Sequence, residues 1–490
     1  MTAPPPAAAA ARPLSPAPSL DNTQPAAKRQ RTMQSQGDNG AIPSPTKTPR
    51  KRTLPYQQGM HLAPMVRIGT LPLRLIALEY GAELVWGPEI VDKAIIGAER
   101  KVDPRTGVIS FCKNGRSIFD CHPLEKSRLI FQLGSASPDL AVQAMKVIEN
   151  DVAGVGLNCG CPKSFSLSGG MGAALLKEPE KLCSILSALV QATDLPVDAK
   201  IRLLPLPPKA VSSDPASAAA TLATPVATPP PAPDAAQPTP SAVLEPTIPP
   251  TLTVPASTAD LAAAEADDSP SSFSSSQEEP TLALVARIFD TGIANLTVHC
   301  RTQEMRSREP ALHERMRGIT EMGRERGIPV VCNGDAVGGG KEAGWGNFDQ
   351  VCEKTGVISV MIARAAEANP SCFSRSGLAD PISEVIPKLL RVAILTQNQY
   401  NNTKYILNAM SLTDSPTPPS RETNREYKQK MNKAKTYEDM ADVFGISRDE
   451  VKRLQAVEGA EATKTFEELV PRWTKRREEI LLADETAIVP

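Results

Sequence analysis

The stretch Val155-Gly156-Leu157-Asn158-Cys159-Gly160-Cys161-Pro162 indicates most directly how this chain folds. Its first residues are apolar, as in a short buried strand, and the strand then stops at a tight turn that presents Cys161. The glycine cluster Gly169-Gly170-Met171-Gly172 follows, where the backbone can pass close to a ligand before a helix begins. A buried strand ending in a polar, thiol-bearing turn predicts a functional residue at Cys161, although a cysteine there is more often a small core residue.

Seven similar apolar segments flank this strand, and stretches with helical spacing separate them. The eight segments occupy residues 61–63, 84–86, 129–133, 155–158, 197–201, 295–300, 329–333 and 359–362. Helix starts between them are clear, as at Ser137-Pro138-Asp139 and Glu178-Pro179. Short, nearly all-apolar strands that alternate with helices are typical of a parallel sheet closed into a barrel. We therefore predict an α/β fold, a (β/α)8 TIM barrel.

Two segments fall outside this pattern, in keeping with a chain of 47 prolines and only 4% aromatic residues. Residues 204–280 are Pro, Ala, Ser and Thr with acids and one base, Lys209, which predicts a disordered acidic insertion that a polyanion would repel. Without it, residues 54–203 and 281–372 supply 242 residues, close to the roughly 250 of a TIM barrel. Residues 1–53 are predicted to form a disordered basic tail, with eight Lys or Arg against two acids.

Several features bear on where the protein resides. The tail's clusters Lys28-Arg29-Gln30-Arg31 and Pro49-Arg50-Lys51-Arg52 are typical of a nuclear-import signal, an RNA-binding arm or a solubilising tail. Nine cysteines without regular spacing, and no apolar signal region, indicate reduced thiols in an intracellular protein. No uncharged apolar run could span a bilayer. We expect a cytoplasmic protein, a nuclear protein or both, with no membrane contact and no obligate protein partner.

Beyond the barrel, residues 373–445 are predicted to form a small all-helical domain, and residues 446–490 a helical tail of unassigned function. The domain is rich in bases, so that one face could lie along phosphates, with an ordinary solvated helix face as the alternative. These bases are Lys388, Arg391, Lys404, Arg421, Arg425, Lys428, Lys430, Lys433 and Lys435.

Polar or small residues follow seven of the eight predicted strands, where barrel enzymes place their chemistry. They are Pro64-Met65-Val66, Gln132, Asn158 and Cys161, Lys200 and Arg202, His299 and Arg301, Asn333-Gly334-Asp335, and Ala363-Arg364-Ala365. Backbone amides near Gly334 and Ala363 fall where such barrels commonly bind phosphate, which predicts a phosphorylated cofactor. Lys200 could neutralise an electron-rich ring and Gln132 could bind its edge. The alternatives are a Lys200–Glu89 ion pair and, for His299, a satisfied core histidine.

Six motifs in this order resemble the tRNA-dihydrouridine synthases, most closely the eukaryotic class that acts on the D-loop uridine at position 20 of tRNA. The resemblance covers about residues 60–410 without the insertion. The motifs are Leu62-Ala63-Pro64-Met65-Val66, Asn158-Cys159-Gly160-Cys161-Pro162-Lys163, Gly169-Gly170-Met171-Gly172-Ala173-Ala174-Leu175-Leu176, Lys200-Ile201-Arg202, Val298-His299-Cys300-Arg301 and Met361-Ile362-Ala363-Arg364-Ala365-Ala366.

The resemblance implies an FMN-binding barrel that uses NADPH, or NADH, to reduce the C5–C6 double bond of uridine in tRNA. It makes Cys161 the general acid that protonates C5 after hydride transfer to C6, so its thiol should stay protonated. Asn158 and Arg301 are implied to face the uracil. The residues implied to surround FMN are Pro64, Met65, Val66, Gln132, Lys200, His299, Asn333, Gly334, Asp335, Ala363 and Arg364.

This chain departs from the family at a few positions. Members of this class commonly have glycine where Cys300 stands and Gly-Gly where Gly334-Asp335 stands, and a carboxylate near a phosphate is unfavourable unless it faces away. A double-stranded-RNA-binding domain, which animal relatives carry at the C-terminus, is not evident after Phe444. A metal site or disulfide at Cys159 and Cys161 is a minor alternative, and we expect no metal because no second ligand pair has a usual spacing.

Three other functions stay open at this stage: an FMN barrel acting on a small molecule, a Schiff-base lyase built on Lys200, and a non-catalytic RNA-binding protein. The basic helices argue against the first, a bound flavin would exclude the second, and the third would not need polar strand ends.

Overall fold

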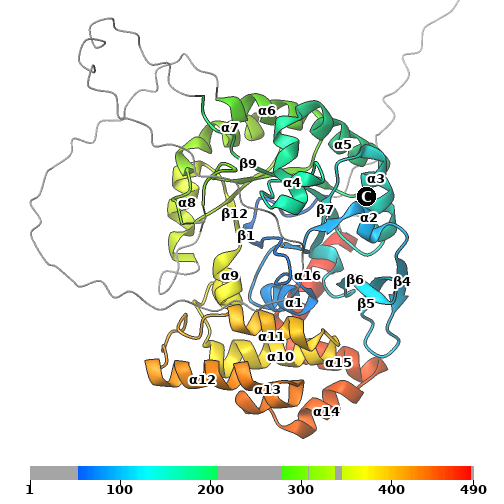
Figure 1. Ribbon diagram of the computed structural model, residues 1–490, viewed down its shortest axis with the longest axis vertical. Coiled ribbons are helices and arrows are strands. Elements are labelled where there is room, and N and C mark those ends of the chain that lie inside the picture. The colour runs from blue at the N-terminus through cyan, green and yellow to red at the C-terminus, as the bar shows by residue number, and fades with distance from the viewer. Residues whose placement is uncertain (1–52, 208–278, 307, 337–344, 487–490) are drawn as a thin grey trace, which may run out of the picture. The chain divides into compact units, whose positions relative to one another are not determined.

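The computed structural model describes residues 53–207, 279–306, 308–336 and 345–486, and it has a closed barrel of eight parallel strands (Figure 1). In ring order β2 pairs with β7, then β8, β9, β10, β11, β12 and β1, and β1 pairs with β2 to close the ring. The strands are β1 (Gly59–Leu62), β2 (Val85–Trp86), β7 (Leu129–Gly134), β8 (Gly154–Cys159), β9 (Val197–Arg202), β10 (Asn295–His299), β11 (Val330–Asn333) and β12 (Ser359–Ile362). The TIM-barrel prediction is confirmed, and each predicted strand overlaps an observed one.

Helices surround the outside of this ring (Figure 1). They include α1 (Leu71–Glu79), α3 (Pro138–Ile148), α5 (Pro179–Ala192), α6 (Pro280–Asp290), α7 (Arg317–Glu325) and α8 (Phe348–Thr355). The first four carry a proline in the first turn, where no intrahelical N–H bond is lost. At α3 the hydroxyl of Ser137 accepts the amide of Leu140 at 3.4 Å, which caps the helix as the sequence predicts.

Side chains alternate along the strands between the helix layer and the barrel interior. On β9, for example, Val197, Ala199 and Ile201 belong to the large apolar core beneath the helices, and Asp198 and Lys200 take the other face. The interior is filled by a second apolar cluster. It comprises Tyr56, Ala63, Leu84, Trp86, Ile130, Val331 and Met361. Because the barrel is packed inside, an opening for ligands can lie only at its rim.

A three-stranded antiparallel sheet, not predicted from the sequence, follows the second barrel strand. It consists of β4 (Glu99–Val102), β5 (Ile109–Lys113) and β6 (Arg116–Cys121), while β3 (Ile90–Val91) extends the barrel beside β7. Asn114 and Gly115, with φ of 52° and 73°, make the tight turn between β5 and β6. Arg105 then donates to the carbonyls of Leu454 and Val457 at 3.4 and 2.8 Å, which ties the sheet to the C-terminal helices.

The chain after the barrel is helical, as predicted. The main helices are α10 (Ile386–Leu395), α11 (Tyr400–Ala409), α12 (Arg421–Lys433), α13 (Tyr437–Val443), α14 (Arg448–Ala456), α15 (Gly459–Leu469) and α16 (Pro471–Thr486). Helix α16 is fixed to the barrel: buried Glu79 of α1 accepts the amides of Arg472 and Trp473 at 3.0 and 3.1 Å, and the indole of Trp473 donates to Leu124 O at 3.0 Å. Lys388 of α10 completes this contact with an ion pair to Glu79 at 3.1 Å.

Other predictions about organisation stay predictions. The basic tail of residues 1–53 and the acidic insertion of residues 204–280 lie almost entirely outside the described residues, and the boundaries at 372/373 and 445/446 are not tested. Within the part of the chain that the structure describes, no helix has both the length and the apolar character needed to cross a membrane.

Candidate active site

The turn after β8 holds Cys161 at the rim of the barrel. Asn158, the fifth residue of β8, accepts the amides of Gly160 and Cys161 on its side-chain oxygen at 3.0 and 3.2 Å. The carbonyl of Gly160 in turn accepts Arg202 Nε at 2.9 Å, and the carbonyl of Cys161 accepts the amide of Ala173 at 3.0 Å. The backbone on both sides of the half-buried thiol is therefore fixed by the chain itself.

Gly172 explains the glycine cluster that follows. Its φ is 58°, and a Cβ there would clash with the hydroxyl of Ser166 and lie 2.7 Å from the carbonyl oxygen of Cys161. The glycine cluster is predicted to let the backbone pass close to a ligand. At Gly172 the backbone instead passes close to the Cys161 turn of the protein itself, which only glycine allows.

The thiol of Cys161 is protonated at neutral pH. Burial raises its pKa, and the nearby Glu89 carboxyl raises it further, against lowering contributions from the Lys163 backbone and the Ser166 hydroxyl. A protonated thiol suits a proton donor and is the wrong state for a nucleophile or a metal ligand. This agrees with the role that the sequence predicts for Cys161.

Sequence reasoning named Glu89 only as a possible ion-pair partner of Lys200 and missed its place beside Cys161. Burial raises the pKa of its carboxyl, and hydrogen bonds with Asn158 and Cys161 oppose that rise. Its Oε1 atom is buried and has no hydrogen-bond partner among the described residues. A Cβ on Gly134 would lie 2.7 Å from that oxygen. Glu89 follows β2, the only one of the eight barrel strands after which no candidate residue is predicted from the sequence. Barrel enzymes place functional residues after the carboxyl ends of their strands, and this rule also points to Glu89.

Lys200 and Gln132 lie on the strands that flank the Cys161 turn. Lys200 of β9 is aligned with Asn158, and Gln132 of β7 is aligned with Gly156, so their side chains share the inward face of the sheet. Burial and, after it, the charge of Arg202 lower the pKa of Lys200 to about 8, and Asp198 opposes the change. The alternative of a Lys200–Glu89 ion pair is not seen, because the charges that act on Lys200 are those of Arg202, Asp198 and two cysteines.

A cavity of about 220 Å³ opens between the ends of β10, β11 and β12. Seven predicted site residues line it, together with Ala336, Met361, Ile362 and Ala365. The seven are His299, Arg301, Asn333, Gly334, Asp335, Ala363 and Arg364. The strand register explains why they meet, since His299 is aligned with Asn333 and Asn333 with Met361.

Two arginines face one carboxylate in this cavity. Buried Arg301 and exposed Arg364 each form an ion pair with Asp335, which also accepts the amide of Ala311 at 3.0 Å. Burial raises the pKa of Asp335, but the Arg301 hydrogen bond and the other partners outweigh it and hold the pKa below its ordinary value. The cavity therefore keeps a net positive charge, which answers the concern that Asp335 would repel a phosphate. The φ of 45° at Asp335 also explains why glycine suits this position.

His299 is a neutral imidazole pressed against Gly334. Burial, followed by the charges of Lys200, Arg202, Arg301 and Arg364, lowers its pKa to about 2. Gly334 has a φ of 99°, and a Cβ there would lie 2.7 Å from His299 Cδ2. Asn333 donates its side-chain amide to Met361 O at 2.8 Å. The wall of the cavity is therefore built without room for a larger residue at 334.

The remaining predicted residues lie at the same rim but not in this cavity. Pro64 and Met65 are half-buried after β1, and Val66 is 56% exposed, an apolar surface open to a ligand. Asn158 belongs to the group around Cys161, whereas Arg301 belongs to the cavity, so the two residues predicted to face the base are not brought into contact within the described residues.

Comparisons with known proteins agree with this architecture. The family model described as dihydrouridine synthase matches residues 61–205 and 273–464. The tRNA-dihydrouridine(20) synthase [NAD(P)+] of Schizosaccharomyces pombe is 39% identical over 404 residues, 80% of this chain and 66% of its own length. The Saccharomyces cerevisiae protein of the same name is 32% identical over 368 residues, 72% of this chain and 77% of its own.

Solved structures resemble the chain only weakly. The old yellow enzyme from Trypanosoma cruzi aligns with 64% of this chain and 86% of its own, at 10% identity and a TM-score of 0.33, a likeness too weak to support any inference. The family match, in contrast, covers more than half of the chain and spans every strand end described above. The chain belongs to the dihydrouridine synthase family.

Proposed function

We propose that this protein is a tRNA-dihydrouridine synthase that reduces the C5–C6 double bond of the D-loop uridine at position 20, with FMN as cofactor and NADPH or NADH as reductant. The names of the two yeast relatives support the substrate, the position and the nicotinamide. The observation that carries the proposal is the protonated, half-buried Cys161 at the carboxyl edge of the barrel. That position is where a TIM barrel presents its chemistry.

The residues of the rim fit a flavin mononucleotide. The cavity after β11 and β12 holds the guanidinium groups of Arg301 and Arg364, which would bind the phosphate. At Gly334 the lack of a side chain leaves the backbone open to it. Beyond it, Lys200 offers a positive charge, and Gln132 is 3% exposed with no hydrogen-bond partner for its amide among the described residues. Buried polar groups without partners cost free energy unless a ligand satisfies them. These groups would hold the ring.

FMN, when bound, supplies the hydride that reaches C6 of the uracil. Cys161 supplies the proton: its thiol hydrogen passes to C5, and the sulfur is left as a thiolate that solvent or Glu89 can reprotonate. Asn158 keeps the thiol in place because its oxygen binds the two amides of the turn. Neutral His299 can only donate or accept hydrogen bonds here, since at a pKa of about 2 it carries no charge.

The helical region offers a narrower basic surface than the sequence predicts. Four of the nine bases are used inside the protein: Lys388 pairs with Glu79 and Arg391 with Glu450, while Lys404 and Lys428 donate to helix-end carbonyls. The other five are exposed on α12 or directly after it, and one of them, Lys430, forms a surface ion pair with Glu426 at 2.7 Å. They are Arg421, Arg425, Lys430, Lys433 and Lys435. We propose that this basic edge of α12 contacts the tRNA backbone, because uridine must leave its stack to reach the rim.

An absorbance experiment on the purified protein tests the proposed function. We expect a flavin spectrum that NADPH or NADH bleaches anaerobically and that unmodified tRNA then restores, with dihydrouridine appearing at position 20. Restoration by free uridine or another small molecule, but not by tRNA, would favour the small-molecule oxidoreductase. A colourless protein that binds tRNA would favour the non-catalytic alternative.

We also propose that the protein acts in the cytoplasm, the nucleus or both, because the basic clusters at residues 28–31 and 49–52 resemble import signals. Fluorescent fusions in which those bases are changed to alanine should lose any nuclear signal. An unchanged distribution would contradict an import role.

A further inference from the structure

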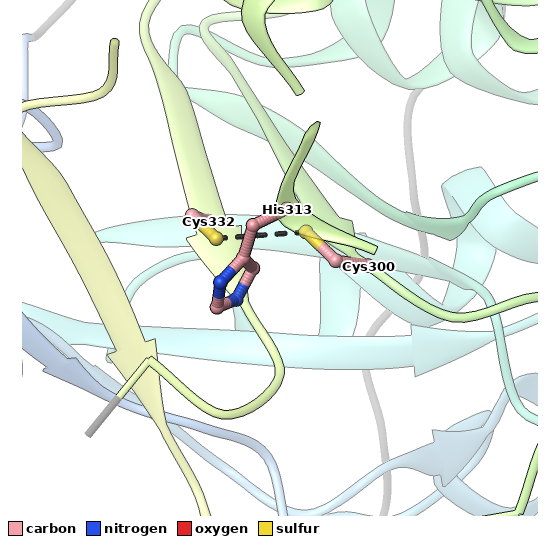
Figure 2. Close-up of side chains that lie close together, drawn as sticks. All are labelled: Cys300, His313 and Cys332. Atoms are coloured by element: carbon pink, nitrogen blue, oxygen red, sulfur yellow. Dashed lines mark hydrogen bonds between the residues drawn. The ribbon is translucent and has the colours of Figure 1, made fainter. Parts of the chain in front are cut away.

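Three potential metal ligands meet behind the wall of the cavity (Figure 2). Cys300 directly follows β10 and Cys332 lies in β11, and both point away from the barrel interior into the apolar core. Their sulfurs are 3.5 Å apart. Buried His313, the first residue of the short helix η4 (His313–Arg315), lies beside them, with one ring nitrogen within 4.8 Å of both sulfurs (Figure 2). All three side chains are buried, Cys300 and Cys332 completely.

The distances suit a single ion. One ligand atom from each residue lies within 4.8 Å of the other two. A tetrahedral zinc ion with Zn–S bonds of about 2.3 Å and a Zn–N bond of about 2.0 Å places its ligand atoms roughly 3.5–3.8 Å apart. The sulfur pair, 3.5 Å apart, therefore needs a shift of only a few tenths of an ångström. The imidazole nitrogen, within 4.8 Å of both sulfurs, needs to approach them by at most roughly 1 Å.

The hydrogen bond of His313 supports the same interpretation. Its Nε2 atom lies 2.7 Å from the carbonyl oxygen of Gly334. A carbonyl can only accept, so Nε2 carries the proton and Nδ1 keeps its lone pair. Histidines that bind metals characteristically donate their second nitrogen to a carbonyl or carboxylate in this way, which fixes the tautomer and the ring orientation.

As thiols, the two cysteines are joined by one weak sulfur–sulfur hydrogen bond inside the apolar core. Thiolate sulfur and imidazole nitrogen are ligands that Zn²⁺ and Cu⁺ prefer over harder ions.

We propose that Cys300, His313 and Cys332 bind one thiophilic metal ion, Zn²⁺ or Cu⁺, outside the barrel wall. Binding releases the two thiol protons to solvent and leaves the oxidation state of the sulfurs unchanged. The ion would join β10, β11 and η4 directly behind Gly334. It is a structural element beside the proposed cofactor cavity and takes no part in the reduction of uridine.

Elemental analysis of the full-length protein tests this proposal independently of activity. After purification in the presence of Zn²⁺ and exhaustive dialysis, we expect about one Zn per chain, the stoichiometry of a single site. The double variant Cys300→Ser/Cys332→Ser should lose the metal. Cys372→Ser, which changes an equally buried cysteine of η7 (Pro370–Phe373) outside the cluster, should keep it.

A milder variant and a second readout guard against misfolding. His313→Gln retains an amide that can donate to Gly334 O and should lower metal affinity at least tenfold in a competition titration with a chromogenic chelator. Co²⁺ substitution should give a sulfur-to-cobalt absorption band that is absent from the double variant. Wild-type protein that stays metal-free after incubation with Zn²⁺ and Cu⁺, a Cys300–Cys332 disulfide found by mass spectrometry under reducing purification, or equal metal in all variants would overturn the proposal.

Discussion

The two halves of the barrel rim differ in how far the protein satisfies its own polar groups. Around β10, β11 and β12, Arg301, Asp335 and Arg364 are joined in ion pairs and Asn333 is bonded to Met361. Around β7, β8 and β9, one oxygen of buried Glu89 has no hydrogen-bond partner among the described residues, and burial lowers the pKa of Lys200. The first half is assembled in advance, as suits a cofactor that stays bound. The second half leaves polar groups whose bonds a bound flavin ring and the incoming uridine would complete, and each unmet buried group costs about 1–3 kcal/mol.

The largest effect expected from this comparison lies at Cys161. Cys161→Ala should retain flavin and its reduction by NADPH while slowing dihydrouridine formation by about 10²–10⁴, the usual contribution of a general acid. Cys159→Ala is the matched control, because that thiol is packed in the apolar core and donates to Leu157 O. Single-turnover mixing of the reduced enzyme with tRNA measures both rates. Full turnover by Cys161→Ala would refute its role.

Exchanging glycine for alanine in each half separates cofactor binding from proton transfer. Gly334→Ala should weaken flavin binding by about tenfold or more, for two reasons. The new methyl group would clash with His299, and the left-handed backbone conformation costs alanine about 1–2 kcal/mol. Gly172→Ala should keep flavin but slow uridine reduction, since the methyl displaces the Cys161 carbonyl. Gly377→Ala is the control: Gly377 has a φ of 90° and open space around it, so this variant measures the effect of backbone strain alone. Fluorescence titration with FMN ranks the three, and equal losses would break the comparison.

The pH dependence of flavin binding should follow Lys200. With its pKa lowered to about 8, the ammonium is charged at neutral pH and loses its proton as the pH rises past 8. Loss of that charge should weaken flavin binding by up to about tenfold between pH 7 and 9, the effect of about 1.4 kcal/mol. Lys200→Met should bind more weakly at pH 7 and show no such decline. The same slope in both proteins would mean that another group titrates.

A smaller effect is expected on the tRNA surface, away from both halves of the rim. Arg425→Ala and Lys433→Ala should each weaken tRNA binding a few-fold and reduce its dependence on salt, because each removes about one phosphate contact. Lys452→Ala, on exposed α14, is the control. Gel-shift titrations at several salt concentrations measure the slope, and flavin binding should not change in any of the three.

The sequence predicts the barrel well because its strands are short, nearly all-apolar segments. The stretches between them space their apolar residues as a helix does, so the two kinds of element are easy to tell apart. It fails for β4, β5 and β6, which are partly exposed and carry residues such as Glu99 and Arg116, so that only their pairing with one another identifies them. At the site, strand-end logic brings seven of the predicted residues into one cavity. It cannot foresee that Asp335 is neutralised by two arginines, nor that Lys404 and Lys428 cap helices of other segments, because those partners are distant in sequence.

The contact between Glu79 and Trp473 has a consequence for how the molecule is made. The two residues are 394 positions apart, yet the carboxylate of the first barrel helix reaches its amide partners only in the last helix. A nascent chain emerging from the ribosome must therefore wait for nearly complete synthesis before this helix is buried as in the finished protein. Such distant contacts form slowly, which makes the unfinished chain a natural client for chaperones.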